Sequence, residues 1–188
     1  MIVAVVLAAG ASSRMGSPKA LLQIGDISLI EAHIESLLSV CSEVVVVVGA
    51  HKSEISPLCE RARVKVVVND NWADSDSLES LKVGIGAFPV VEHVVVTPVD
   101  TPPVRVSDLR ALVNGKAPAV LSWHGVHGHP VMIGKAEVQH MFTHEVSGGL
   151  RSLMSQVRLV PASTADILCN LNTPELWRSY LAEHSDKK

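Results

Sequence analysis

The chain has 188 residues, of which 47% are hydrophobic and 19% charged, and its formal net charge is -3 at pH 7. This composition predicts one globular domain over residues 1–188, and the slightly acidic balance argues against nucleic acid as a partner. No stretch approaches the roughly 20 apolar residues of a membrane span. The three cysteines lack CxxC spacing, which disfavours a disulfide framework and favours a reducing cytoplasm.

The chain begins with a predicted strand over residues 2–7, whose β-branched residues fit a central strand covered on both faces. Small residues follow it. In open α/β sheets ligands bind at the carboxyl ends of strands, and uncrowded backbone N–H groups there can approach phosphate oxygens. Arg14 and Lys19 add positive charge to the same loop. The stretch therefore predicts a phosphate-binding loop.

This loop matches neither of the two common nucleotide fingerprints. A Walker loop needs a glycine directly before the lysine, where Pro18 stands, and the dinucleotide fingerprint needs its second glycine at Ser12. Gly10 and Gly16 can adopt backbone conformations closed to other residues, which lets the loop curl around a ligand. The sequence indicates a third kind of nucleotide loop.

The order Leu-Ala-Ala-Gly-x-Ser-x-Arg-Met-Gly-x-Pro-Lys over residues 7–19 resembles the signature of the nucleotidyltransferase family that includes the molybdenum cofactor guanylyl- and cytidylyltransferases. The resemblance implies a Rossmann-like, three-layer α/β/α fold with a mostly parallel sheet. It implies that Arg14 holds the β- and γ-phosphates and that Lys19 stabilises the α-phosphate. The other nucleotide-binding residues that it implies in this loop are Leu7, Ala8, Ala9, Gly10, Ser12, Ser13 and Gly16.

Helices and strands alternate in the next part of the chain. Apolar residues at helical spacing predict a helix over residues 28–40, and a valine run predicts a buried strand over residues 44–48. A short helix over residues 53–62 and a strand over residues 64–68 follow. This alternation is typical of a doubly wound parallel sheet with right-handed crossovers.

The next helix is predicted to open within residues 74–78, with Ser or Asp at its cap, and to run to about residue 87. In the resembling family a Ser-Leu-x-x-x-x-x-Gly pattern here lies near the base and ribose. Ser77, Leu78 and Gly84 match that pattern, so Ser77 and Gly84 are predicted to bind nucleotide, with Ser80 as a further candidate. Helix capping alone is the alternative interpretation of these serines.

The fourth strand starts at residue 93 and leads to Asp100, just before a proline-stiffened turn. A carboxylate at the carboxyl end of a central strand is well placed to hold Mg²⁺ against phosphate oxygens. Asp100 is therefore the predicted metal ligand and Mg²⁺ the predicted cofactor, with simple turn formation as the alternative. Val99 replaces the glycine that family members often carry before this Asp, and it could crowd the backbone.

A helix over residues 107–113 and a strand over residues 118–122 precede a segment with three histidines. A zinc site is disfavoured there, because no Cys or acidic partner adjoins them. In cytidylyltransferase-like family members a Gly-x-x-Gly-His-Pro segment lies at the acceptor pocket, and residues 125–130 match it. His129 is thus the predicted acceptor-binding residue. Val126 and His127 stand where a basic residue is usual, so a changed acceptor is plausible.

The remaining chain carries three more acceptor-side candidates. Arg151 precedes a predicted helix to about residue 156 and could meet an acceptor phosphate, although the acidic residue of the matching family segment is missing. A strand is predicted over residues 166–169. It leads to Asn-x-Asn-Thr-Pro-Glu-Leu, a string that resembles guanylyltransferase-like members and makes Asn170 and Asn172 pocket residues. Thr173 is expected to cap a helix that begins at Pro174.

The predicted reaction is in-line attack of an acceptor oxygen on the α-phosphorus of a nucleoside triphosphate, with release of pyrophosphate. The resemblance favours CTP as donor and molybdopterin as acceptor, because Ala9 and the Gly-His-Pro segment follow the cytidylyl pattern. GTP as donor and a sugar or alditol phosphate as acceptor are the alternatives. A non-catalytic nucleotide-binding accessory protein is the alternative of another class, and a molybdoenzyme is a possible protein partner.

Overall fold

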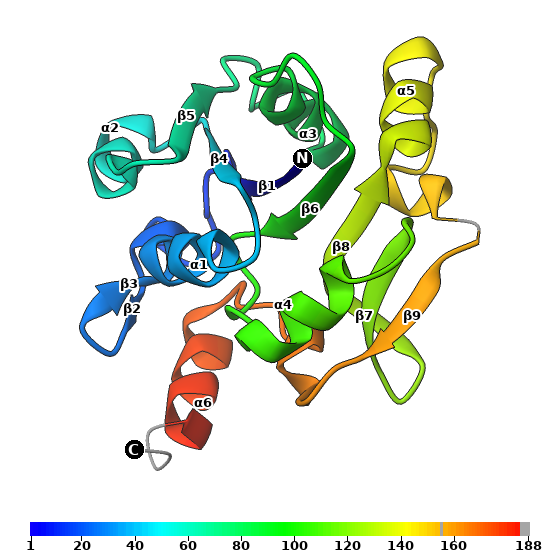
Figure 1. The fold of residues 1–188 in the computed structure, drawn as a ribbon. Helices are drawn as coiled ribbons and strands as arrows, with labels where there is room; N and C mark the ends of the chain where they lie inside the picture. The colour runs from blue at the N-terminus through cyan, green and yellow to red at the C-terminus, as the bar shows by residue number, and fades with distance from the viewer. Residues whose placement is uncertain (155, 185–188) are drawn as a thin grey trace.

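The computed structural model describes residues 1–154 and 156–184, and its centre is a seven-stranded sheet of order β5-β4-β1-β6-β8-β7-β9 (Figure 1). The sheet strands are β1 (Ile2–Ala8), β4 (Glu43–Val48), β5 (Val64–Val68), β6 (His93–Pro98), β7 (Ala119–Trp123), β8 (Val126–Gly134) and β9 (Arg158–Pro161). Strands β2 (Gln23–Ile24) and β3 (Ile27–Ser28) form a separate antiparallel pair.

Six α-helices and four short 3-10 helices are found in the described residues. The α-helices are α1 (Leu29–Leu38), α2 (Lys52–Ile55), α3 (Ser77–Ile85), α4 (Val106–Val113), α5 (Lys135–Thr143) and α6 (Pro174–His184). The 3-10 helices are η1 (Lys19–Leu21), η2 (Ser56–Cys59), η3 (Leu150–Leu153) and η4 (Ala165–Leu168). No helix of these stretches is long and apolar enough to cross a membrane.

In the seven-stranded sheet only β8 runs opposite to the other strands. β1 pairs in parallel with β4 on one side and β6 on the other, and β5 continues the parallel order. β8 runs antiparallel to both β6 and β7, whereas β9 is parallel to β7. The predicted, mostly parallel sheet is confirmed. Its parallel part delivers the carboxyl ends of β1, β4 and β6 to one edge, where ligand sites form in such folds.

The sheet is the middle of three layers, as predicted. Alternate residues of β1 point to opposite faces: Val3 and Val5 belong to the apolar cluster with α3 and α5, and Ala4 and Val6 to the cluster with α1, α4 and α6. All four are fully buried. A strand covered on both faces needs an unbroken apolar run, which explains the composition of β1.

Polar residues at the helix starts fix where the elements begin. Ser28 and Glu31 form a capping box at α1, each side chain accepting from the other's backbone N–H. At α3 the cap is Asp76, whose Oδ1 accepts from two backbone N–H groups at 2.9 Å. The predicted cap of α6 is also found, because the Thr173 hydroxyl accepts from the Leu176 N–H. Ser77 is therefore not needed for capping.

Several local predictions are wrong, most of them in the second half of the chain. The expected strand over residues 166–169 is the 3-10 helix η4, because the Asp166 carbonyl accepts from the Cys169 N–H and bends the chain. The expected helix after Arg151 is only η3, and residue 155 of that prediction lies outside the described residues, as do residues 185–188 of the predicted domain. The expected helix over residues 53–62 is split into α2 and η2, with a proline in the first turn of η2.

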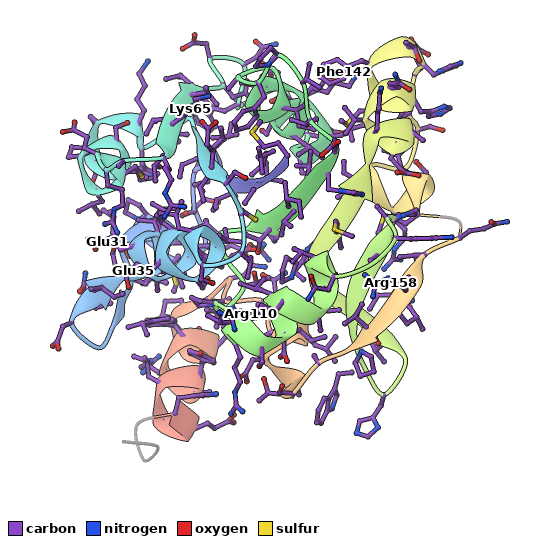
Figure 2. All side chains as sticks on the ribbon, in the orientation of Figure 1. Glu31, Glu35, Lys65, Arg110, Phe142 and Arg158 are labelled. Atoms are coloured by element: carbon purple, nitrogen blue, oxygen red, sulfur yellow. The ribbon has the colours of Figure 1, made fainter. Side chains whose placement is uncertain are left out.

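Two strands of the central sheet were not predicted, nor was the short pair β2 and β3; long-range contacts explain the two in the central sheet. β8 contains Gly128 and Pro130, which disfavour strands locally, but it fills the place between β6 and β7. β9 is held at the edge by Arg158, whose guanidinium donates to the carbonyl oxygens of Leu112 and Lys116 beside the end of α4 (Figure 2). Pairing partners far along the chain decide such strands.

Candidate active site

The loop after β1 is curled back on itself by its own backbone. Ser12 has a φ of +53° and Gly16 one of +75°. The Met15 N–H donates to the Ser12 carbonyl at 2.9 Å, and the Lys19 N–H donates to the Ser12 hydroxyl at 3.1 Å. The Met15 side chain is buried in the core, which anchors the loop, while Arg14 is exposed. Lys19 is thereby turned inward over the sheet edge.

A cavity of about 250 Å³ lies beside this loop, and we call it the nucleotide-side cavity. A Cβ atom built on Gly10 would meet no protein atom within 4 Å, so the absence of a side chain there is not required by packing. Gly49 differs, because its Cβ would lie 2.5 Å from the Ala9 carbonyl oxygen. The lining residues are Leu7, Ala8, Ala9, Gly10, Ser12, Pro18, Lys19, Ala20, His51, Ile55, Trp72, Ser75, Asp76, Ser77, Ser80, Pro98, Val99 and Asp100.

Lys19 contacts two residues that are distant from it in the sequence. Its Nζ donates to Asp100 Oδ2 at 2.9 Å and also to Asn172 Oδ1, which lies 153 positions further along the chain. The Lys19 and Asp100 side chains are 14% and 22% exposed, so the ion pair is shielded but reachable from the cavity. A carboxylate oxygen and an amide oxygen thus converge on one positive charge.

The backbone around Asp100 is held from two directions. The Asp100 carbonyl accepts from the Leu171 N–H at 2.7 Å, which ties the segment of Asn172 to β6. The Thr101 carbonyl lies 2.8 Å from Nε2 of His33, a buried residue of α1. Burial lowers the pKa of His33 to about 4, so the ring is neutral at neutral pH and its Nε2–H donates this bond. The turn therefore presents Asp100 from a fixed position.

Val99, in place of the family's usual glycine, is accommodated. Its side chain is buried in the apolar cluster that includes α1 and α4, and its N–H donates to the Leu7 carbonyl at 3.0 Å. The anticipated crowding of the backbone is not found, because the side chain points into the core rather than toward Lys19.

A second cavity of about 480 Å³, the acceptor-side cavity, opens on the other side of Asp100. Gly128 of β8 allows the close approach that closes it, since a Cβ there would lie 2.3 Å from the Ile167 carbonyl oxygen of η4. Its lining residues are Leu7, Ser77, Val96, Pro98, Asp100, Val120, His127, Gly128, His129, Val131, Gly148, Gly149, Leu150, Arg151, Met154 and Asn170. Apolar side chains in this wall include Val96, Val120, Val131, Leu150 and Met154.

His129 contributes a buried polar atom to this second cavity. Within residues 1–154 and 156–184, its Nδ1 is buried with no hydrogen-bond partner. Burial lowers the pKa of His129, with the nearby Asp100 charge opposing the shift, so the ring is predominantly neutral. A buried polar atom without a partner costs free energy that a ligand can recover.

The two cavities meet along a common wall made of Leu7, Ser77, Pro98 and Asp100. A ligand in one cavity therefore lies next to a ligand in the other, with Asp100 and the Lys19 ammonium between them. This geometry suits a reaction that joins two substrates and needs negative charge to be neutralised at their junction.

The structure brings most predicted site residues to these cavities, and some elsewhere. Ser13, Arg14 and Gly16 are exposed on the loop and line neither cavity. Gly84 lies inside α3, where a Cβ would come within 2.8 Å of Val5 and Val47, so it provides close helix–sheet packing. The predicted residues that line a cavity are Leu7, Ala8, Ala9, Gly10, Ser12, Lys19, Ser77, Asp100, His129, Arg151 and Asn170, while Asn172 reaches the site through Lys19.

His51 is a cavity residue that the sequence analysis did not select. Its Nε2 lies 3.0 Å from the Ala11 carbonyl and its Nδ1 lies 3.1 Å from Glu54 Oε1, so it links the loop after β1 to α2. Its position directly after the buried strand β4 was the available signal, because neighbouring parallel strands end at the same edge.

A divalent cation fits the donors at Asp100 in part. In the described part of the chain, no group of three or more His, Cys, Asp or Glu side chains could hold a metal ion. Mg²⁺, however, is usually bound by one or two carboxylates together with substrate phosphates and water. Asp100 Oδ2 and Asn172 Oδ1 already converge on a cation, the Lys19 ammonium, and they are oxygen donors of the type that Mg²⁺ prefers.

The chain has similarities to known proteins along its length. The family model of the MobA-like NTP transferase domain matches residues 4–162. The chain is 26% identical to a molybdenum cofactor cytidylyltransferase from Escherichia coli, over 91% of both proteins. It is 35% identical to a nicotine blue oxidoreductase from Paenarthrobacter nicotinovorans, over 64% of this chain and 60% of that relative.

Solved structures share the fold. A nucleotidyl transferase from Methanothermobacter superposes with a TM-score of 0.83 at 26% identity, covering 100% of this chain and 99% of that one. A manganese complex of a Mycobacterium tuberculosis protein superposes with a TM-score of 0.78 at 22% identity, covering 96% and 98% of the two chains. This second likeness concerns the fold alone.

Proposed function

Because the chain belongs to the MobA-like NTP transferase family, and is thus a nucleotidyltransferase by family, we propose that it transfers CMP from CTP to a small phosphorylated acceptor. The observation that carries this proposal is the pair of cavities that share Asp100, with the Lys19 ammonium 2.9 Å from its carboxylate. One cavity then takes the triphosphate and the other the acceptor.

Positioning and neutralisation of charge supply the catalysis in this proposal. An acceptor oxygen attacks the α-phosphorus, the bond from that phosphorus to the bridging oxygen of the β-phosphate breaks, and pyrophosphate leaves. Lys19 moves from Asp100 to the α-phosphate, and Arg14 folds from the exposed loop onto the β- and γ-phosphates. The bare backbone from Ala8 to Gly10 receives further phosphate oxygens. No protein nucleophile is needed.

We propose Mg²⁺ as the cofactor, held by Asp100 and Asn172 together with the nucleotide phosphates. Bound there, it would neutralise phosphate charge that one lysine leaves uncompensated. Asn172 is an uncharged oxygen donor, so the protein contributes a single negative charge to the ion. The phosphates must then complete the site, which predicts that metal and nucleotide bind together.

The acceptor is proposed to be molybdopterin or a related small phosphorylated molecule. Its cavity offers an apolar wall for a ring system, the His129 Nδ1 for a polar edge and the Arg151 guanidinium for a phosphate. GTP as donor remains the second candidate, supported by the Asn-x-Asn-Thr string at Asn170 and Asn172. A sugar or alditol phosphate as acceptor follows after these, and a molybdoenzyme would be the protein that receives the product.

The experiment measures pyrophosphate release from CTP, GTP, ATP and UTP with molybdopterin and with sugar phosphates, each with and without Mg²⁺. Calorimetric binding of the same nucleotides runs in parallel. Release that depends on Mg²⁺, on one nucleotide and on an acceptor supports the proposal. Tight triphosphate binding without release for any acceptor would instead favour a non-catalytic accessory protein.

A further inference from the structure

A buried amide stands behind the wall of the nucleotide-side cavity. Asn69 follows β5 and is only 4% exposed. Its Nδ2 lies 2.8 Å from the Ser75 hydroxyl and 3.0 Å from the Ser80 hydroxyl. Both serines line the cavity, whereas Asn69 does not. The amide therefore reaches the cavity only through these two hydroxyl groups.

The orientation of the Asn69 amide is fixed by a backbone group. The Asn71 N–H lies 3.1 Å from Asn69 Oδ1, and a backbone N–H can only donate. The amide oxygen must therefore face Asn71, and the amide NH₂ must face the serines. Both of its protons are used, one on each hydroxyl.

The two serine hydroxyls are left with donor capacity. Each accepts a proton from Asn69, so its own O–H is free to donate elsewhere. Among residues 1–154 and 156–184, no second hydrogen bond is found for the Ser75 or the Ser80 hydroxyl. Ser80 is buried and faces the cavity from the first turns of α3, so a ligand in the cavity is the available acceptor.

We propose that Asn69 is a positioning residue that makes this wall a hydrogen-bond donor and thereby selects the base of the nucleotide. The inference rests on the proposed function, because it concerns the same nucleotide site. A donating wall favours a base with neighbouring acceptors, such as O2 and N3 of cytosine. Uracil keeps the O2 acceptor but carries a proton on N3, which would face a hydroxyl proton and leave that one donor without an acceptor.

The experiment is calorimetric binding of CTP and UTP to the full chain, to Asn69→Asp and to Ser75→Ala. We expect the unmodified chain to bind CTP about tenfold more tightly than UTP, the scale of one unpaired hydrogen-bonding group. The carboxylate of Asn69→Asp only accepts, so both hydroxyls turn their protons toward it and offer lone pairs to the cavity. The CTP preference should then be lost or reversed.

Two comparisons separate this effect from other causes. Asn114→Asp makes the same chemical change at an exposed position after α4 and should keep the tenfold ratio. Ser75→Ala removes one hydroxyl without adding charge, so it should lower the ratio even if Asn69→Asp fails to fold. If Asn69 had only a structural role, Asn69→Asp would weaken the binding of CTP and of UTP equally, and the ratio of the two affinities would not change.

The outcomes distinguish this inference from the function on which it rests. If the unmodified chain binds both nucleotides equally, or if Asn69→Asp and Ser75→Ala keep the original ratio, the donor wall is overturned and nucleotidyl transfer stands. If no nucleoside triphosphate binds at all, the proposed function itself is overturned.

Discussion

The two cavities on either side of Asp100 are built in different ways. The nucleotide-side cavity takes its longest continuous stretch of lining residues from the end of β1 and the loop after it, and the rest from α2, the start of α3 and the segments at the ends of β4, β5 and β6. The acceptor-side cavity is assembled from β8, the glycines before η3 and Asn170, which are separate segments of the second half. In our proposals the first cavity binds the triphosphate with this loop and selects the base with Ser75 and Ser80, whereas the second selects the acceptor with side chains from separate segments.

The ion pair of Lys19 with Asp100 gives the largest expected effect, because Asp100 belongs to the shared wall of the two cavities. Lys19→Ala should lower turnover by about 10²–10³-fold, since it removes the charge proposed to stabilise the α-phosphate. Thermal unfolding should show that the variant remains folded. Lys135→Ala, on the exposed start of α5, is the matched control. Normal turnover of Lys19→Ala would remove this ion pair from the proposed mechanism.

Two glycine substitutions compare the cavities directly. Gly128→Ala places a Cβ 2.3 Å from the Ile167 carbonyl oxygen, and we expect it to destabilise the fold by about 1–3 kcal/mol in urea unfolding. Gly10→Ala meets no protein atom, so its unfolding free energy should stay within about 0.5 kcal/mol of the original. It should nevertheless weaken CTP binding, because the methyl group occupies ligand space. Unchanged CTP binding would place the phosphates elsewhere.

His33 tests whether the turn at Asp100 is held by a neutral ring. The folded pKa is about 4 against about 6.5 in the unfolded chain, so the unfolded chain takes up the additional proton between these values. The stabilisation that the neutral His33 ring contributes is therefore present in full above about pH 6.5, and it falls as the pH drops toward 4. We expect a loss of about 2 kcal/mol between pH 7 and pH 5 in urea unfolding. His33→Gln does not titrate and should show a smaller loss; an identical pH dependence would contradict this assignment.

Substitution of His129 gives the smallest expected effect, and this effect should concern the acceptor and not the nucleotide. His129→Ala should raise the acceptor KM about tenfold, the scale of one lost hydrogen bond in a buried site, while CTP binding measured by calorimetry stays the same. His140→Ala, on the exposed face of α5, serves as the control because His140 lines neither cavity. If His129→Ala weakened CTP binding as much as it raised the acceptor KM, His129 would have no specific role in acceptor binding.

The loop side was more predictable because its signals are contiguous. The apolar run of β1, the small residues after it and the position of Lys19 are all within the first twenty-two residues, and a local pattern is sufficient to place them. Gly84 shows the limit of such reasoning. It matches a family pattern near the nucleotide, but its neighbours Val5 and Val47 make it a packing position inside the fold.

The second half was less predictable because its strands depend on remote partners. β8 contains Gly128 and Pro130, so its local propensity is poor, and only the open place between β6 and β7 makes it a strand. The segment at residues 166–169 has strand-like composition, yet it bends into η4 against Gly128. In both cases pairing across the fold overrides the local sequence.

The sequence by itself determined the strands β1, β4, β5 and β6, the small-residue loop after β1 and the place of Asp100 at the end of β6, because each depends on residues that are neighbours in the chain. Only the tertiary structure brought Asn172 to Lys19 across 153 positions and used Asn69 to orient the hydroxyls of Ser75 and Ser80. Hydrogen-bond direction depends on which groups face each other after folding. A pattern of residue types cannot contain that information.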